Sequence, residues 1–488
     1  MKNYYYILSL VFLSIFAKSV IAGQEMDIVT YADFSHIRDI AVSMNNVYFA
    51  TSEGIIKYDK FSDEWQKPLT GSPGIDYRNI FKLFVDEFDR KLYARTEMSV
   101  YEYDMMFESW FLIDEIPYLD NPAREVPPSP IMYVPDGYLY SNDGYVQDVR
   151  GFDYPINRII DDPSGVKWLS LWGKGAAKTT SADIIEFLPY GLMQNRVNKI
   201  FYSDGSIVVG GDNVGSTHTG ITFFDYDNNQ FYYKESGLTF EFPDEDIKCF
   251  EEDDKYFYVG TSGGLFVLDI ETLEVVKNIT DRNGLIDNEL LSLKKNKDKL
   301  YIGTQNGLQV LTGNSESLHL VYPNQFQNQE IFDLEVTDTT LWIASAIGAF
   351  QLHLETNKLK QFKDPHQIIF KRVYNIERDG NNLFLASQNG IVRLNLKDGK
   401  TSQFLSDSHG ANYRALAVNN DVAFISTDFG FSMFFLTEDG YDNEREFTTT
   451  DGIPSQFVYD LLIDGDYLWI GSDKGLSLFL WNDPDRID

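Results

Sequence analysis

Tyr301-Ile302-Gly303-Thr304-Gln305-Asn306-Gly307-Leu308 is one copy of a motif that recurs along most of this 488-residue chain. Close copies lie at 258–265 and 469–476, and weaker ones at 48–55, 342–349, 384–391 and 424–431. The last Gly of each copy, or its equivalent, marks eleven positions: 54, 99, 144, 175, 220, 264, 307, 348, 390, 430 and 475. The steps are 40 to 45 residues, apart from a step of 31 between 144 and 175. Such a period, with about four strands per unit, is typical of β-propeller blades.

The unit around residue 300 shows how each repeat is built. Residues 290–294 alternate in polarity, 297–299 form a polar turn, and 300–304 and 308–311 predict two further strands. Second and third strands are apolar nearly throughout, as expected for strands covered on both faces by neighbouring blades. Fourth strands such as 358–362 are the most polar and fit an outer edge. The sequence therefore predicts an all-β fold, a β-propeller built from about eleven four-stranded repeats.

The two ends of the sequence predict how the propeller closes. The last unit supplies three strands before a polar tail at 482–488, and a lone strand at 27–33 precedes the first unit. The simplest pairing places this N-terminal strand outermost in the last blade, which closes the ring. Eleven units exceed the 4–8 blades of ordinary propellers, so two rings are favoured over one large ring. Two rings require either that one is inserted within the other or that a degenerate unit near 104–165 is miscounted.

The N-terminus predicts export. Lys2 precedes an apolar run at 7–17, and small or apolar residues end at Ala22 before an expected cleavage site. The run is too short for a membrane helix. We therefore expect a signal peptide at 1–22, a propeller repeat region at 23–488 with no assigned boundary between rings, and no direct membrane insertion. The expected location is the periplasm or the medium.

The charge of the chain excludes some partners. With 41 basic and 74 acidic residues the formal net charge is −33, which repels nucleic acid phosphates, so no nucleic acid partner is expected. Acidic stretches at 225–229, 241–246 and 251–254 suggest calcium loops, but the first and last fall at recurring turn positions. Turn-forming carboxylates explain them better, and no metal is expected. The single cysteine, Cys249, falls in a predicted first strand and is expected to be a buried thiol.

The motif order resembles the two-component regulator propeller repeat of bacterial periplasmic sensors. The copies ending at Leu265, Leu308 and Leu476 match that repeat well, and 281–288 and 451–456 are similar to its lead-in segment. The resemblance covers almost all of 27–488 and is strongest from about 240 onward. It implies a propeller fold similar to a sensor domain. Sensors of this family continue into a β-sandwich, a membrane helix and a kinase, none of which follows within these 488 residues.

No catalytic motif stands out. The six histidines show no metal-ligand spacing, and neither a Gly-x-Ser-x-Gly elbow nor a phosphate loop is found. We therefore expect no catalytic residue and no cofactor. The favoured function is a non-catalytic exported recognition or scaffold module that binds a protein or an oligosaccharide through the loop face of the propeller. The alternative is an exported propeller enzyme, either a polysaccharide lyase or a glycoside hydrolase.

Irregular loops provide the candidate binding residues. The connection 116–130 is long and rich in proline, and the loop 210–220 is longer than its counterparts. Insertions on the loop face of a propeller often carry specificity. A tryptophan at 172 replaces the usual small residue and offers an aromatic platform, although a core position is the alternative. We predict that one rim carries the binding residues Trp172, Lys174, Asn213 and His218. The central opening is the other possible location of the site.

Overall fold

The structure, a computed structural model, describes residues 28–482 with internal gaps. The gaps are 71–74, 76, 78–79, 118–131, 142, 181, 213, 215–217, 239–241, 244, 314–316, 370, 388, 407–412, 420 and 438–439. The expected signal peptide and most of the proline-rich connection lie outside the described residues. No helix among the described residues is long and apolar enough to cross a membrane.

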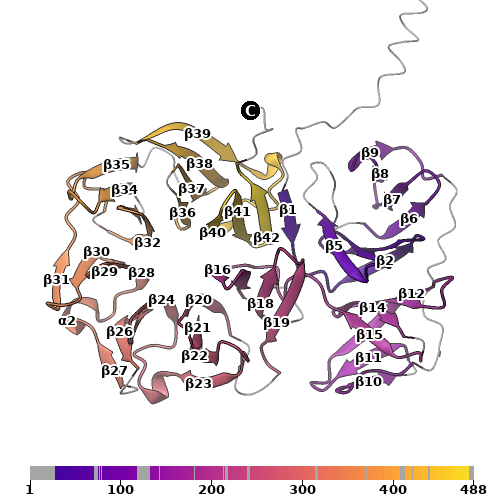
Figure 1. Cartoon of the computed structure of the whole chain (residues 1–488), viewed down its shortest axis with the longest axis horizontal. Coiled ribbons are helices and arrows are strands. Elements are labelled where there is room, and N and C mark those ends of the chain that lie inside the picture. Colours follow the sequence, from indigo (N-terminus) through magenta and orange to yellow (C-terminus); the bar gives the residue numbers. More distant parts are fainter. Residues whose placement is uncertain are drawn as a thin grey trace, which may run out of the picture.

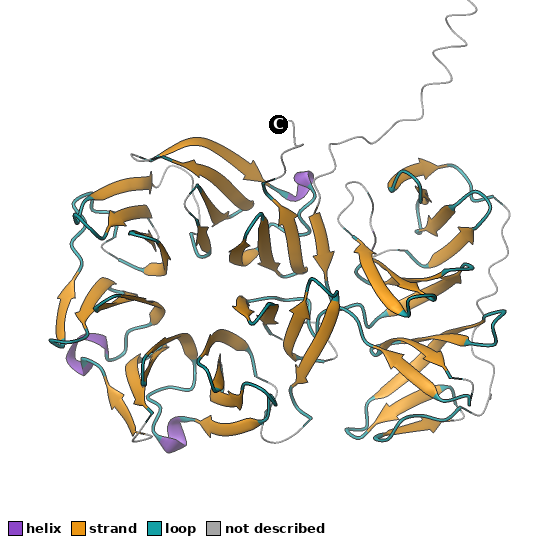
Figure 2. Cartoon of the chain, viewed as in Figure 1, coloured by secondary structure: helices purple, strands orange, loops and turns teal. Residues whose placement is uncertain are grey.

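The described chain consists almost entirely of strands, β1 to β42, arranged in ten antiparallel sheets (Figure 2). The predicted all-β fold is therefore confirmed. Short helical turns are η2 (Asp281–Asn283), α2 (Pro323–Phe326) and η4 (Thr449–Asp451).

Seven of the sheets surround a common centre, and we call them the ring (Figure 1). The first two are β16 (Lys199–Ser203), β17 (Ser206–Gly210), β18 (Gly220–Asp225), β19 (Gln230–Glu235), and β20 (Ile247–Glu252), β21 (Tyr256–Thr261), β22 (Gly264–Asp269), β23 (Val275–Ile279). The next two are β24 (Leu290–Asn296), β25 (Lys299–Thr304), β26 (Gly307–Thr312), β27 (Ser317–Leu320), and β28 (Ile331–Thr337), β29 (Thr340–Ser345), β30 (Gly348–His353), β31 (Lys358–Gln361).

The remaining ring sheets bring the two ends of the described chain together. Two of them are β32 (Val373–Asp379), β33 (Asn382–Ser387), β34 (Gly390–Asn395), β35 (Thr401–Ser406), and β36 (Leu416–Val418), β37 (Val422–Thr427), β38 (Gly430–Leu436), β39 (Tyr441–Phe447). The last contains β40 (Val458–Asp464), β41 (Tyr467–Ser472), β42 (Gly475–Leu480) and β1 (Ile28–Tyr31). Strand β1 pairs antiparallel with β42, with Ile28 opposite Phe479, which is the pairing expected for the lone N-terminal strand.

Three further sheets stand beside the ring, and we call them the arc (Figure 1). Two are β2 (Ile37–Val42), β3 (Asn46–Thr51), β4 (Ile55–Asp59), β5 (Glu64–Leu69), and β6 (Lys82–Asp86), β7 (Lys91–Arg95), β8 (Val100–Asp104), β9 (Ser109–Ile113). The third has six strands, β10 (Tyr138–Ser141), β11 (Tyr145–Asp148), β12 (Asp153–Asp161), β13 (Lys167–Leu171), β14 (Gly175–Thr179) and β15 (Ile185–Leu188).

The arc corrects the count of repeats. The marks at 144 and 175 belong to one six-stranded sheet, so the structure has ten sheets where the repeat marks predict eleven. Strand β12 is nine residues long, and its register shifts between Ile156 and Arg158. Its first part pairs with β11 and its second with β13, which is why these two marks lie closer together than the others. In the described residues the sheets form a ring of seven and an arc of three, inserted in sequence between β1 and β16, rather than two similar rings.

A recurring bulge in the first strands links neighbouring sheets. Asp460, the first paired residue after the bulge, accepts the backbone N–H of Ile200 at 2.8 Å, and the equivalent Asp333 accepts that of Ile376 at the same distance. In the arc, the carboxylate of Asp39 accepts a backbone N–H of β6 at 3.0 Å. Hydrogen bonds to a buried carboxylate are among the stronger polar contacts in proteins. The bond from β16 to Asp460 joins the last sheet of the ring to the first.

The chain crosses between the ring and the arc twice, at 32–36 and 189–198, and we call these segments the junction. Asp33 and Gly191 form an antiparallel bridge, and the N–H of Leu192 donates to the carbonyl of Ala32 at 2.8 Å. One continuous hydrophobic core extends from the arc, through the junction, into the ring. The ring and the arc are therefore packed into one body.

Aromatic rings fill this core. Tyr190 stacks on Trp65 of the arc with 4.8 Å between centroids and meets Phe231 of the ring edge-on at 5.0 Å. Phe34 stacks on the same tyrosine at 6.0 Å. Each such pair contributes about 0.5–1.5 kcal/mol beyond the burial of its surface. Tyr190 thus packs simultaneously against the junction, the arc and the ring.

Substituting Gly191 with Ala tests how closely the two crossings pack. Gly191 has a φ of 95°, and an added Cβ would lie 2.4 Å from the carbonyl oxygen of Ala32 and 2.6 Å from the Phe34 ring. We expect a loss of about 3 kcal/mol or more in the free energy of unfolding, measured with urea. Gly151→Ala is the matched control, because its φ of 86° is similar and nothing lies within 4 Å of the added Cβ. This control should lose only about 1–2 kcal/mol; equal losses would contradict close packing.

Candidate functional site

A cavity of about 650 Å³ lies where the ring and the arc meet. The junction residues Phe34, Tyr190 and Leu192 line it, as do strands β14 and β15 of the arc and β19 of the ring. Nine other lining residues are apolar: Ile56, Pro135, Ala176, Ile184, Ile185, Phe187, Leu188, Pro189 and Met193. The lining also includes polar and charged side chains, among them Asp33, Glu186 and Glu235. A cavity of this volume is large enough for a small ligand or for part of a larger one.

Lys174 provides a positive charge in the cavity wall. It lies in the turn between β13 and β14, where the flanking Gly173 and Gly175 both have positive φ, at 83° and 96°. Its Nζ lies 5.3, 5.6 and 5.8 Å from the ring centroids of three aromatic residues: Tyr138, Tyr154 and Phe187. Aromatic faces attract a cation but do not neutralise it. Among the described residues, no carboxylate lies within salt-bridge distance of Lys174.

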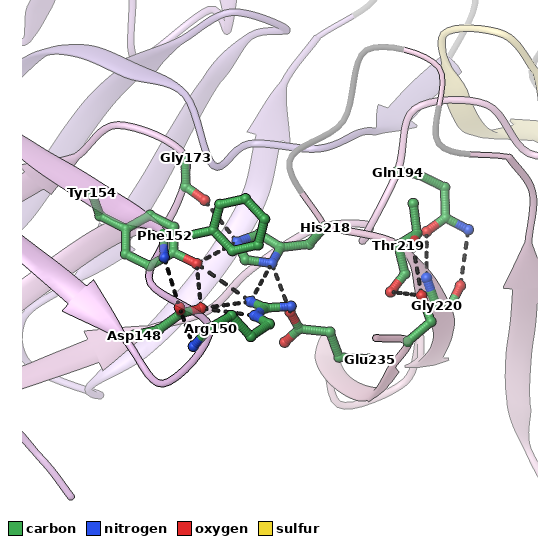
Figure 3. A network of polar contacts seen from close by, with 11 residues as sticks. Asp148, Arg150, Phe152, Tyr154, Gly173, Gln194, His218, Thr219, Gly220 and Glu235 are labelled. Atoms are coloured by element: carbon green, nitrogen blue, oxygen red, sulfur yellow. Dashed lines mark hydrogen bonds and ion pairs between the residues drawn. The ribbon is translucent and has the colours of Figure 1, made fainter. Parts of the chain in front are cut away.

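A polar bridge joins the arc to the ring beside the cavity (Figure 3). We define it as Asp148, Arg150, Tyr154, His218 and Glu235. Arg150 of the arc pairs through Nη1 with Oε1 of Glu235 at 2.6 Å, and through Nη2 with Oδ2 of Asp148 at 2.7 Å. The hydroxyl of Tyr154 donates to the same Asp148 oxygen at 2.9 Å. A cation of the arc is thus held between one carboxylate of its own sheet and one of the ring.

His218 occupies the centre of the polar bridge. Its Nδ1 lies 2.6 Å from Oε1 of Glu235, and its Nε2 lies 3.1 Å from the carbonyl oxygen of Gly173 (Figure 3). Nη2 of Arg150 also lies 3.1 Å from Nδ1, so the imidazole contacts both members of the Arg150–Glu235 ion pair. Burial alone would raise the pKa of Glu235, but the hydrogen bond from His218 and the charges of His218, Arg150 and Lys174 outweigh burial and lower it. Glu235 is accordingly held as a carboxylate.

The predicted binding residues are brought together only in part. Lys174 and His218, one from the arc and one from the ring, both line the cavity. Trp172 is 38% exposed, so it is not a core residue, and it meets His36 edge-on at 4.8 Å. It lines a neighbouring hollow of about 600 Å³ with Phe81 and Arg158 rather than the cavity. Asn213 lies outside the described residues.

Several residues of the site were not predicted. Tyr138 and Phe187 belong to the six-stranded sheet, whose extra hairpin has the sequence pattern of a separate repeat. Arg150 lies in a turn and Glu235 at a strand end, where charged residues are ordinary on any propeller. The pairing of these two residues depends on how the arc packs against the ring. No local sequence pattern predicts that packing.

The acidic stretches 225–229 and 251–254 lie at turns, as interpreted from the sequence. The carboxylate of Asp253 accepts the backbone N–H groups of Lys255 and Tyr256, each at 3.0 Å, and Asp269 caps the next turn in the same way. Within the described part of the chain, no group of three or more His, Cys, Asp or Glu side chains could hold a metal ion. Cys249 is buried as expected, and burial raises the pKa of its thiol to about 12.

The central opening of the ring holds a separate group of charges. Lys199 of β16 pairs with Asp460 of β40 at 3.0 Å, and Lys294 of β24 pairs with Glu335 of β28 at 2.6 Å. Burial, together with the neighbouring charges of Asp333 and Glu335, raises the pKa of Glu377 to about 8. Burial raises that of Asp333 to about 6. These groups come from first strands that pack against one another, so they couple the sheets of the ring.

The fold is shared with solved structures of bacterial surface proteins. PorZ, an essential surface component of the type-IX secretion system of Porphyromonas gingivalis, is 16% identical with a TM-score of 0.51, over 93% of this chain and 69% of PorZ. A structure described as the extracellular domain of a hybrid two-component system from B. thetaiotaomicron is 13% identical with a TM-score of 0.50, over 92% of this chain and 70% of that one. No family model and no curated protein matches the chain. At these identities the similarity shows the fold, which is the propeller-like fold implied by the resemblance to sensor repeats.

The polar bridge makes stability depend on pH in a defined direction. Because the pKa of Glu235 is lowered on folding, its stabilising contribution is present above about pH 4 and is lost as the pH falls through the folded-state value. Glu235→Gln should therefore lower the free energy of unfolding by about 1–3 kcal/mol at pH 7. The difference from the parent protein should shrink below about pH 4. Urea unfolding across this range measures it, and a deficit that persists undiminished at low pH would contradict the assignment.

The charged groups of the central opening make stability depend on pH in the opposite direction. With its folded-state pKa raised to about 8, Glu377 favours folding most where it is protonated, and this advantage is lost as the pH rises through 8. Glu377→Gln removes the ionisation, so we expect it to stabilise the protein above pH 8 by on the order of 1 kcal/mol, allowing for solvent screening of a half-buried group. The gain should decrease toward pH 5 in thermal unfolding. A gain of equal size at all pH values would contradict this assignment.

Proposed function

We propose that the chain is a non-catalytic exported recognition module that binds a protein or an oligosaccharide at the cavity between the ring and the arc. One observation carries the proposal. The turn between β13 and β14 of the arc and the loop between β17 and β18 of the ring meet at this cavity, and they bring Lys174 and His218 to its wall. Concave apolar sites with a few polar groups between structural units are common ligand sites. A ligand in this cavity contacts the ring and the arc together.

The titratable groups at the cavity already bond to other protein groups, which favours binding over catalysis. A general acid or base must reach the substrate with a free proton or lone pair. Here His218 has both nitrogens directed at protein acceptors, and Glu235 is paired with both His218 and Arg150. The polar bridge thus supports the shape of the cavity. No specific observation favours the alternative of a polysaccharide lyase or glycoside hydrolase.

Export is part of the proposal. It is supported by the signal-peptide pattern of residues 1–22 and by the two solved structures, one a surface component and one an extracellular domain. The periplasm or the cell exterior is the location this combination favours. The resemblance to sensor repeats fits the same role, in which a propeller domain binds a ligand and other components respond.

Blocking the mouth of the cavity tests this function. Ile184 lines the cavity and is 40% exposed, so Ile184→Trp adds bulk there with little effect on the core. On peptide and glycan arrays we expect this variant to lose binding by at least about tenfold, or about 1.4 kcal/mol. The matched control is Gln305→Trp, in an exposed turn between β25 and β26 of the ring, which should bind as the parent protein does.

Other outcomes would relocate the site or contradict the proposal. A loss in the Gln305→Trp control equal to that in Ile184→Trp would favour the central opening. Trp172→Ala should change binding by no more than about twofold; a tenfold loss in this variant alone would place the site in the hollow beside Trp172. Full binding by Ile184→Trp and by Trp172→Ala would contradict a site at this face.

A further inference from the structure

The charges that line the cavity are not all neutralised by one another. Glu235 is paired with Arg150 and His218, and Glu186 lies 3.8 Å from Nζ of Lys178. Lys174 is different, because it contacts the faces of aromatic rings, and Glu235, which feels its charge, is already hydrogen-bonded to His218 and paired with Arg150. A cation bordering an apolar space is stabilised further by an anion that enters that space, since the low local polarity strengthens the attraction. The cavity is therefore complementary to a ligand with one negatively charged group.

The apolar lining limits what the rest of the ligand can be. The floor consists of Phe34, Tyr190 and Leu192, and aliphatic residues of β14 and β15 extend it. An oligosaccharide presents hydroxyl groups on most of its surface, and burying those that face these apolar side chains without partners costs roughly 1–3 kcal/mol each. An aliphatic or aromatic side chain meets no such cost. The ligand portion that fits here is an apolar body that ends in an anionic group.

Asp33 adds a requirement for hydrogen-bond donors. This carboxyl group lines the cavity, is 5% exposed, and accepts the backbone N–H of Ser35 at 2.9 Å. Burial raises its pKa. The Ser35 side chain is a second hydrogen-bond partner, and a carboxyl group has acceptor positions beyond these two. A ligand with amide N–H groups can supply the others.

We propose that the cavity binds the carboxyl-terminal end of a peptide whose last side chain is apolar or aromatic. The terminal carboxylate pairs with Lys174, the last side chain packs on the floor of the cavity, and a peptide N–H donates to Asp33. This inference rests on the proposed function, and of its two ligand classes it selects protein over oligosaccharide.

The test compares acetyl-Ala-Ala-Phe with a free carboxylate, the same peptide as its carboxamide, and 4-phenylbutyrate, by isothermal titration. The parent protein should bind the peptide acid at least tenfold more tightly than the amide, and more tightly than 4-phenylbutyrate, which has no N–H group. Lys174→Met should abolish the preference for the acid, whereas Lys174→Arg should keep most of it. Lys358→Met is the matched control, because Lys358 is exposed on β31 of the ring, away from the cavity (Figure 1). Thermal unfolding of each variant establishes that it is folded.

Each unfavourable outcome has a distinct meaning. Equal binding of acid and amide, or an acid preference that survives in folded Lys174→Met, would overturn the pairing with Lys174. Equal binding of 4-phenylbutyrate and the peptide acid would overturn the peptide as occupant. Glycan binding that Ile184→Trp removes, with no binding of any peptide, would overturn this inference and leave the proposed function standing. Absence of all ligand binding on the arrays as well would overturn both.

Discussion

The two crossings of the chain between the ring and the arc are the constraint on which the rest of the molecule depends. Asp33 and Gly191 hold the crossings side by side, and Gly191 allows this because a side chain there would meet the Ala32 carbonyl. The aromatic core around Tyr190 then packs the two units together. The cavity exists because its floor belongs to the junction and its walls belong to different units. Lys174 and His218, which are far apart in the sequence, line one cavity only through this arrangement.

Two different interactions hold the units together, and they respond to different conditions. The aromatic core is insensitive to pH and depends on close packing. The polar bridge depends on ionised Glu235 and on the cation of Arg150. Since both lie at the cavity, the shape of the cavity depends on both. The charges in the central opening belong to the seven ring sheets alone and couple them to one another.

The strands were predicted well from the sequence, because the polarity pattern and the turn residues of each repeat specify the strands of that repeat. Strand β25 is buried apart from its first residue, whereas the fourth strand β31 is largely exposed, as their polarity predicts. Gly307 has the positive φ expected at a repeat mark. The arrangement of the sheets was harder to predict, because the same motif specifies sheets in the ring and sheets in the arc. The six-stranded sheet in particular follows from the length of β12, not from the motif.

The candidate site includes predicted residues only where the chain departs from the repeat. Lys174 and His218 lie in irregular turns, and the structure places both at the cavity. The prediction for Trp172 rested on a similar irregularity, yet its side chain lines the adjacent hollow. Gly173, which has a positive φ, turns the chain between this hollow and the cavity. Arg150 and Glu235 could not be identified, since their contact arises from tertiary packing.

The pairing of β1 with β42 has a consequence for biosynthesis. The hydroxyls of Thr30 and Ser477 are hydrogen-bonded across 447 positions of sequence, so the last ring sheet cannot form until almost the whole described chain has been made. The arc, at 37–188, is complete much earlier and contains the partners of its own sheets. We expect the arc to fold first, while β1 keeps an exposed strand edge that other chains can pair with. We expect the newly made protein to be most prone to aggregation during that interval, because the edge of β1 is still open.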